Sequence, residues 1–129
     1  MSDFNNKLKK CADLHSLSGV SEERIKEAEE KLKLKFAAEY RKYLLEFGVA
    51  SAAGHEFTGL CEFPRLNVVE NTIKERENNK NIPDNLYLIE HANIDDIIVW
   101  QSETGFVYIT RYNIHPEKIS NSLAEYIDL

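Results

Sequence analysis

The sequence is poor in cysteine, glycine and proline. Its 129 residues include two cysteines, five glycines and three prolines. Cys11 and Cys61 form no C-x-x-C pair and lie near apolar residues, so we interpret them as reduced residues of the core. The five glycines are scattered and form no Walker A or G-x-G-x-x-G pattern, which argues against a phosphate-binding loop.

Long apolar runs are also missing. No stretch approaches the ~18 consecutive apolar residues of a transmembrane helix. The segment MSDFNNKLKK has no apolar core of the kind found in signal peptides. We therefore expect a protein that is neither embedded in a membrane nor exported by such a signal, and the reduced cysteines favour the cytoplasm.

Basic residues are fewer than acidic residues. Sixteen lysines and arginines stand against 22 acids, which gives a net charge of −6. Binding to a nucleic-acid backbone needs clustered basic side chains, so we expect no direct contact with nucleic acid. The segment from Asn81 to Thr110 holds five acids and no lysine or arginine, and these acids are Asp84, Glu90, Asp95, Asp96 and Glu103.

Patterns for metal binding and catalysis are absent too. The four histidines are scattered and form no H-E-x-x-H motif. Asp95 and Asp96 are adjacent in the sequence. Because neighbouring strand residues point to opposite faces, we do not expect their carboxylates to share one metal ion. There is no G-x-S-x-G motif of a serine nucleophile, and Cys61 has no base nearby in the sequence. A base that the fold brings close to Cys61, such as His91, stays open as an alternative. We expect no metal, no cofactor and no catalytic group.

The residues that are present predict a protein with several helices. With 43% hydrophobic residues, the chain suits one domain over residues 1–129. Ser21 is a strong N-cap followed by two glutamates, Gly48 ends a helix, and Ser122 opens an S-x-x-E capping box. The predicted helices are Phe4–Ala12, Glu22–Leu32, Tyr40–Phe47, a short one at Val68–Ile73 that frays toward Asn81, and a last turn or two after Ser122.

Strands follow in the second half. Leu86–His91, Ile97–Trp100 and Phe106–Thr110 are rich in β-branched and aromatic residues, and the last two are predicted to form an antiparallel hairpin at Gly105. Trp100 and Tyr108 are expected in the core, with an interface role as the alternative. We interpret 50–54 as a loop and 55–63 as a short strand or an irregular crossing. Helices first and strands later indicate an α+β fold.

Four stretches of the sequence resemble the SUKH superfamily, the Smi/Knr type of domain found in bacterial immunity proteins. They are VSEERIKEAEEKLKLKF, AAEYRKYLLEFG, IPDNLYLIE, and ETGFVYIT followed by SLAEYID. Together they span about Val20 to Ile127. Ala37 stands where the family usually has proline, and Phe47 where it usually has asparagine before Gly48. The resemblance implies N-terminal helices packed on a mixed, mostly antiparallel sheet, with a short C-terminal helix.

The resemblance also implies a function. Such domains often act as immunity proteins without catalytic activity. They neutralise a cognate toxin, commonly a nuclease, that neighbouring cells deliver by contact-dependent or other secretion systems. Nucleases need basic surfaces to bind phosphates, and an acidic protein can cover such a surface. We therefore expect a basic toxin domain as the partner, and we expect it to meet Asp84, Glu90, Asp95, Asp96 and Glu103, with Glu56 and Glu62 as lesser candidates.

Other interpretations stay open at this point. The acids could simply protect a solvated sheet edge. The domain could be a non-catalytic regulatory or scaffold module of the same fold. A small hydrolase that uses Cys61 or a pair of carboxylates is a third alternative. The oligomeric state does not follow from the sequence.

Overall fold

The structure is a computed structural model that describes residues 3–92, 96–111 and 115–129. Helices come first and most strands later, which confirms the predicted α+β order. The helices are α1 (Asp3–Lys10), α2 (Glu22–Leu32), α3 (Ala38–Phe47), α4 (Val68–Asn78) and α5 (Leu123–Tyr126), with a 3-10 turn at Pro64–Leu66. The strands are β1 (His15–Ser16), β2 (Ala50–Ala52), β3 (His55–Glu56), β4 (Leu86–His91), β5 (Ile98–Ser102), β6 (Val107–Thr110) and β7 (Glu117–Ser120).

Local capping chemistry sets the helix boundaries. The Ser21 hydroxyl accepts the backbone N–H of Arg24 at the start of α2, as predicted. Asn67 caps α4 and Ser122 caps α5 in the same way. Gly48 terminates α3 with a φ of 70°, in the region that glycine adopts without strain. These caps depend only on near neighbours, and the sequence pattern located Ser21, Gly48 and Ser122, whereas the Asn67 cap was not predicted.

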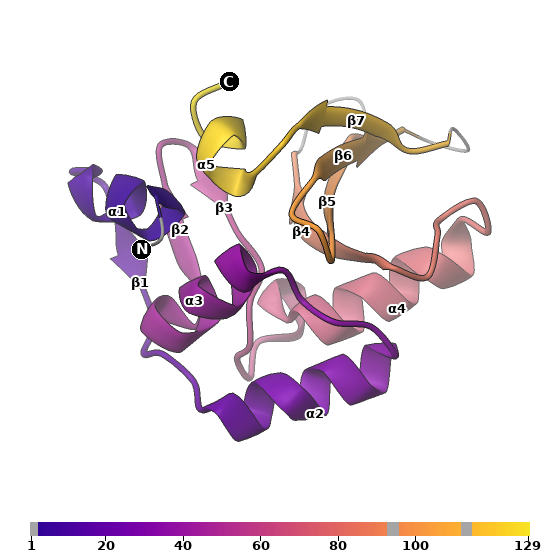
Figure 1. Ribbon diagram of the computed structural model, residues 1–129, viewed down its shortest axis with the longest axis horizontal. Coiled ribbons are helices and arrows are strands. Elements are labelled where there is room, and N and C mark those ends of the chain that lie inside the picture. Colours follow the sequence, from indigo (N-terminus) through magenta and orange to yellow (C-terminus); the bar gives the residue numbers. More distant parts are fainter. Residues whose placement is uncertain (1–2, 93–95, 112–114) are drawn as a thin grey trace.

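The described strands form two antiparallel sheets. A four-stranded sheet has the order β4-β5-β6-β7, and a small sheet has the order β1-β2-β3. The predicted hairpin is β5 and β6, which pair antiparallel from Ile98 opposite Thr110 to Gln101 opposite Val107. The larger sheet curls strongly across one side of the molecule (Figure 1). The Thr58 N–H donates to the Ile89 carbonyl at 2.7 Å, which joins the two sheets where β3 runs past β4.

The segment interpreted as a loop at 50–54 is partly a strand, which corrects that expectation. Ala50–Ala52 forms β2 because its small residues fit between two neighbours: Ser16 pairs with Ala50 on one side, and Glu56 pairs with Ser51 on the other. Only the start of the predicted crossing, β3, is a strand. The strands β1 and β7 were not predicted.

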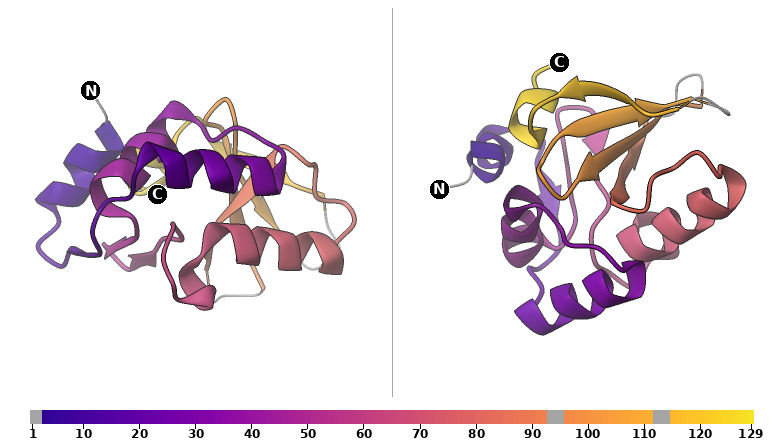
Figure 2. Two further views of the ribbon diagram at one scale, coloured as in Figure 1. Left: turned by 90° about the horizontal axis from the view of Figure 1, so that it is seen from below. Right: turned by 45° about the vertical axis from the view of Figure 1, so that its right-hand side comes forward.

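The helices surround the sheets unequally. In Figures 1 and 2, α2 and α4 run beneath the four-stranded sheet, and α3 lies between α2 and the small sheet. The short helix α5 sits between α1 and β7 (Figure 1), which brings the first and last helices together. None of the described helices is long and apolar enough to cross a membrane.

Two hydrophobic clusters occupy opposite faces of the larger sheet. The main cluster contains Tyr87, Ile89 and Val99 together with side chains from each of the five described α-helices. The second cluster consists of Ile82, Leu86, Leu88 and Trp100. Neighbouring residues of β4 alternate between the clusters because strand side chains alternate between faces.

The prediction that the strand aromatics and both cysteines lie in the core is confirmed only in part. Trp100 is fully buried and its indole N–H donates to the Thr110 hydroxyl at 2.9 Å, so its packing role is confirmed. Tyr108 is partly exposed at the edge of the second cluster. Both cysteines are free, but each is only partly buried.

The two departures from the usual family pattern have clear structural roles. The Ala37 N–H donates to the buried Tyr87 hydroxyl at 2.9 Å. A proline at this position has no N–H and would leave that hydroxyl with one partner fewer. Phe47 is buried and packs against Tyr43, with ring centroids 6.1 Å apart.

Candidate partner-binding site

Within the described part of the chain, the acids predicted to meet a partner lie at more than one place in the fold. The β4–β5 ladder pairs Leu86 with Ser102 at one end and His91 with Ile98 at the other. Asp84 and Glu103 adjoin the first end, whereas Glu90 and Asp96 adjoin the second. Five residues of strand separate the two ends, which corresponds to about 17 Å.

The second end of the ladder gathers more of the predicted acids. The Glu56 N–H donates to a carboxylate oxygen of Glu90 at 3.1 Å, so β3 brings Glu56 to this end. Asp96 follows in the turn between β4 and β5, where it is exposed and has a φ of 58°, a conformation that aspartate tolerates. Asp95 lies outside the described residues. We call Glu56, Arg65, His91 and Asp96 the β4-end site.

Glu90 is buried, which corrects the expectation that its side chain faces a partner. It is only 4% exposed. Its carboxylate accepts the Glu56 N–H and the Tyr126 hydroxyl, and it bonds the Nδ1 of His55 at 2.7 Å. The physical cause is a β-bulge in β4 between Leu88 and Glu90, which turns Glu90 toward the same side as Ile89.

His55 depends on this carboxylate for its protonation. The hydrogen bond to Glu90 raises the pKa of His55 above its ordinary value, against the lowering effect of partial burial. Because the folded-state pKa is raised, the protonated imidazole stabilises the fold fully below the unfolded value of about 6.5, and this contribution is lost as pH rises through the folded value.

A pH series on one variant tests this coupling. We expect the free energy of unfolding of the wild type to fall between pH 6 and pH 8, and we expect His55→Gln to remove part of that decrease. Urea denaturation at closely spaced pH values measures both curves. Parallel curves for the two proteins over this range would contradict the assignment.

A small pocket opens at the β4-end site. It has a volume of about 150 Å³ and is lined by Glu56, Thr58, Arg65, Leu66 and His91. The Arg65 guanidinium bonds the Glu56 carboxylate, and both side chains are about half exposed or more. An ion pair at this exposure contributes little to stability, so a cation from a partner can replace Arg65 at low cost.

The first end of the ladder has a mixed charge. One Glu103 oxygen accepts the Lys35 N–H at 3.0 Å, which fastens the β5–β6 turn to the segment between α2 and α3. The groove beside it holds Lys26, Lys33 and Lys35 as well as acids. Asp84 is exposed, and its backbone carbonyl accepts Arg76 at 2.7 Å. These two acids therefore lie among basic side chains.

The last of the predicted acids, Glu62, lies apart from both ends. It is exposed in the loop that precedes the Pro64–Leu66 turn, beside the exposed Phe63. Within the described part of the chain, its carboxylate has no hydrogen bond or ion pair.

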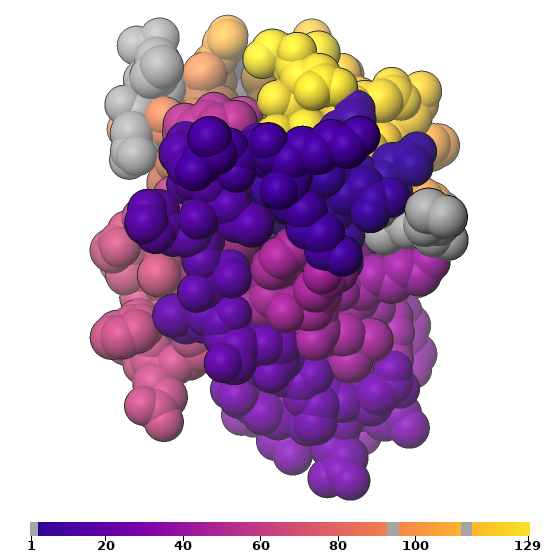
Figure 3. Space-filling view, turned by 90° about the vertical axis from the view of Figure 1, so that its left-hand side faces the viewer, coloured from indigo at the N-terminus to yellow at the C-terminus, as the bar shows by residue number. Residues whose placement is uncertain are grey.

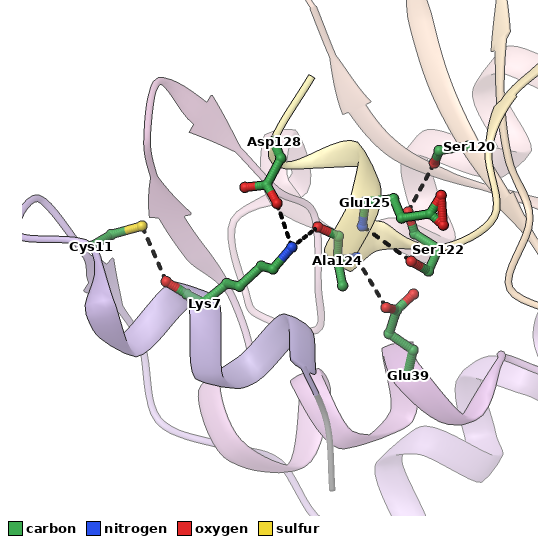
Figure 4. Close-up of polar contacts among 8 residues, drawn as sticks. All are labelled: Lys7, Cys11, Glu39, Ser120, Ser122, Ala124, Glu125 and Asp128. Carbon is green, nitrogen blue, oxygen red and sulfur yellow. Dashed lines mark hydrogen bonds and ion pairs between the residues drawn. The ribbon is translucent and has the colours of Figure 1, made fainter.

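Several residues at the site were missed by sequence reasoning. Arg65 and His91 lie far apart in the sequence, and only the fold brings them to one pocket. Away from this site, sequence reasoning also missed Glu39: its carboxylate accepts the N–H groups of Leu123 at 2.7 Å and Ala124 at 3.1 Å, and so caps α5 from α3 (Figure 4). An acid in the first turn of a helix gave no sign of this distant role.

Two arrangements were sought among the described residues: a cluster of metal ligands and a pair of Cys61 with His91. Over residues 3–92, 96–111 and 115–129, no three histidine, cysteine, aspartate or glutamate side chains are placed to hold a metal ion. The Cys61 thiol lies 3.5 Å from the Phe63 carbonyl, and His91 lies 3.4 Å from the Asn71 amide oxygen. In that part of the chain, no hydrogen bond joins the thiol to His91.

Comparison with known proteins gives the family. A family model described as SMI1-KNR4 cell-wall, one of the SUKH models, matches residues 1–128. A search of curated proteins found none that matches this chain. The matched region includes every described helix and strand of both sheets. The chain therefore belongs to the SMI1-KNR4 family of the SUKH superfamily.

Proposed function

We propose that this protein is a non-catalytic immunity protein. It binds and neutralises a cognate toxin in the cytoplasm, and the toxin is a basic nuclease domain delivered by a contact-dependent or another interbacterial secretion system. The observation that carries the proposal is the family match over residues 1–128, because the SUKH superfamily includes toxin-binding immunity proteins. Binding to a basic toxin domain also accounts for the excess of acidic over basic residues in this chain.

Charge and exposure support a basic partner. The chain carries a net charge of −6, and opposite charges speed the encounter of two proteins. Glu56 and Asp96 present carboxylates at the β4-end site, and Arg65 is the exposed cation that a partner's basic side chain would replace. Fast capture suits a protein that must intercept a toxin already inside the cell.

Co-purification tests the proposal directly. The tagged protein is expressed together with the C-terminal domain encoded by the gene directly upstream. We expect a stoichiometric complex with a basic domain and loss of that domain's nuclease activity in the complex. If no complex forms and a resident cellular protein binds instead, the regulatory or scaffold role replaces the immunity role.

Neutral variants locate the contact surface. Glu56→Gln with Asp96→Asn removes two charges from the β4-end site, and we expect the association rate constant at low salt to fall on the order of threefold or more. The matched control is Asp84→Asn with Glu103→Gln, which removes the same charge at the opposite end of the ladder and keeps an acceptor for the Lys35 N–H. Stopped-flow association measures both. Equal rates for the two double variants would exclude the β4-end site as the favoured contact.

A further inference from the structure

Three large apolar side chains are exposed around the C-terminal end of α3. Leu17 is 44% exposed, Leu45 is 39% exposed and Phe63 is 60% exposed. Single exposed apolar residues are normal on protein surfaces, but a group of them marks an interaction site. We call these three residues the α3-end patch.

Backbone hydrogen bonds hold the three segments of the patch together. The Leu17 N–H donates to the Val49 carbonyl at 2.9 Å, and the Val20 N–H donates to the Leu44 carbonyl at 3.0 Å, so the segment before α2 runs along the end of α3. On the other side, the Leu60 N–H donates to the Gly48 carbonyl at 3.1 Å. Figure 3 shows the segment that leads into α2 as a column between α3 and the 60–66 region.

The surroundings of the patch define the partner's charge. Glu62 adjoins Phe63, is exposed and has no partner among the described side chains. Glu46 adjoins Leu45, and its side chain stays 37% exposed although its carboxylate pairs with Lys9 and accepts the Asn5 amide. An apolar centre with carboxylates at its border fits an apolar projection that lysine or arginine residues flank.

A second copy of this chain fits the patch less well. Two copies would each bring a charge of −6, so they repel each other. A stable dimer also buries roughly 800 Å² per partner, and three partly exposed side chains supply a small part of that area. Charge complementarity therefore favours a basic partner over self-association.

We propose that the α3-end patch is a second contact surface for the basic toxin, in addition to the β4-end site, whose Arg65 follows Phe63 by two residues. This inference rests on the proposed immunity function. The patch supplies apolar contacts that hold the complex together once it has formed, whereas the carboxylates of the β4-end site speed its formation. Apolar contacts at the centre of an interface act mainly on the dissociation rate.

Two double variants test the patch. Leu17→Ser with Phe63→Ser removes an aliphatic and an aromatic side chain from it. Ile73→Ser with Phe106→Ser is the matched control, because these residues are 40% and 37% exposed on α4 and beside β6. The probe is the purified C-terminal domain encoded by the upstream gene, and surface plasmon resonance measures both rate constants. Thermal unfolding of each variant checks that it is folded.

The expected result is a Kd about 30-fold higher for the patch variant, the size of one interface hot spot, through faster dissociation, with the control variant close to wild type. Wild-type affinity in a folded patch variant overturns the patch as a contact surface and leaves the immunity function standing. If the wild-type protein itself does not bind the upstream domain, the proposed function fails before the patch is tested. Equal weakening in the patch and control variants also overturns the inference.

Discussion

Replacing Gly59 with alanine is expected to lower the free energy of unfolding by about 3 kcal/mol or more, because the added methyl group meets backbone on a fixed neighbour. A Cβ at Gly59 would lie 1.7 Å from the Gly48 carbonyl oxygen and 2.9 Å from a methyl group of Val49. The Gly48 oxygen belongs to the backbone and cannot rotate away as the end of a flexible side chain could.

The backbone around Gly59 is held from the other side as well. Its N–H donates to the Leu66 carbonyl and its carbonyl accepts the Val68 N–H, both at 2.8 Å. Any shift that relieves the clash stretches these bonds, which place the Pro64–Leu66 turn and the start of α4. The cost of the alanine therefore combines overpacking with weakened hydrogen bonds.

Gly54 provides the control for this prediction. It has a φ of 82° and no atom within 4 Å of an added Cβ, so Gly54→Ala carries only the strain of the left-handed backbone, about 1–2 kcal/mol. Urea denaturation of both variants gives the comparison. A Gly59→Ala protein as stable as Gly54→Ala would show that the segments around Gly48 and Gly59 can move apart at little cost in free energy.

The second large effect is expected at Glu90. Glu90→Ala leaves the Tyr126 hydroxyl, the Glu56 N–H and the His55 Nδ1 without their shared acceptor. Removing one member of a buried charged network costs several kcal/mol, and we expect a loss of about 3 kcal/mol in the free energy of unfolding. The same network joins β3, β4 and α5, so the variant should also expose more surface in its native state.

Two further variants serve as comparisons for Glu90→Ala. Glu90→Gln keeps an acceptor oxygen and is expected to cost less than the alanine. Glu62→Ala, at an exposed acid without a described partner, should change stability by no more than about 0.5 kcal/mol. Chemical denaturation monitored by Trp100 fluorescence measures all three variants. Similar stabilities for Glu90→Ala and Glu62→Ala would refute a structural role for the buried carboxylate.

The parts of the fold that the sequence pattern located are those with local causes. The start of α2 follows from the Ser21 cap, the start of α5 from Ser122, and the β5–β6 hairpin from two apolar runs joined at Gly105. Each signal involves residues a few positions apart. The resemblance to the SUKH superfamily added the arrangement of helices against a sheet, and the family match bears out that resemblance.

The parts that the pattern missed have distant causes. The strand β1 has two exposed residues and exists because it pairs with β2, 35 positions later. Glu90 follows an apolar run and was expected at a surface, but a bulge in β4 turns it inward. Pairing and bulges depend on strands that the local sequence does not contain, so neither the pairing of β1 nor the burial of Glu90 could be deduced before the fold was known.

The meeting of α1 and α5 has a consequence for how the protein is made. The Lys7 ammonium donates to the Ala124 carbonyl at 2.7 Å and pairs with Asp128 (Figure 4). Leu123 and Tyr126 of α5 belong to the main cluster. Contacts of such long sequence separation form slowly, because a long loop of chain must be closed before they can form. On the ribosome, the nascent chain must therefore wait until the segment around residue 128 has left the exit tunnel, and newly made molecules complete the main cluster only after that segment has been translated.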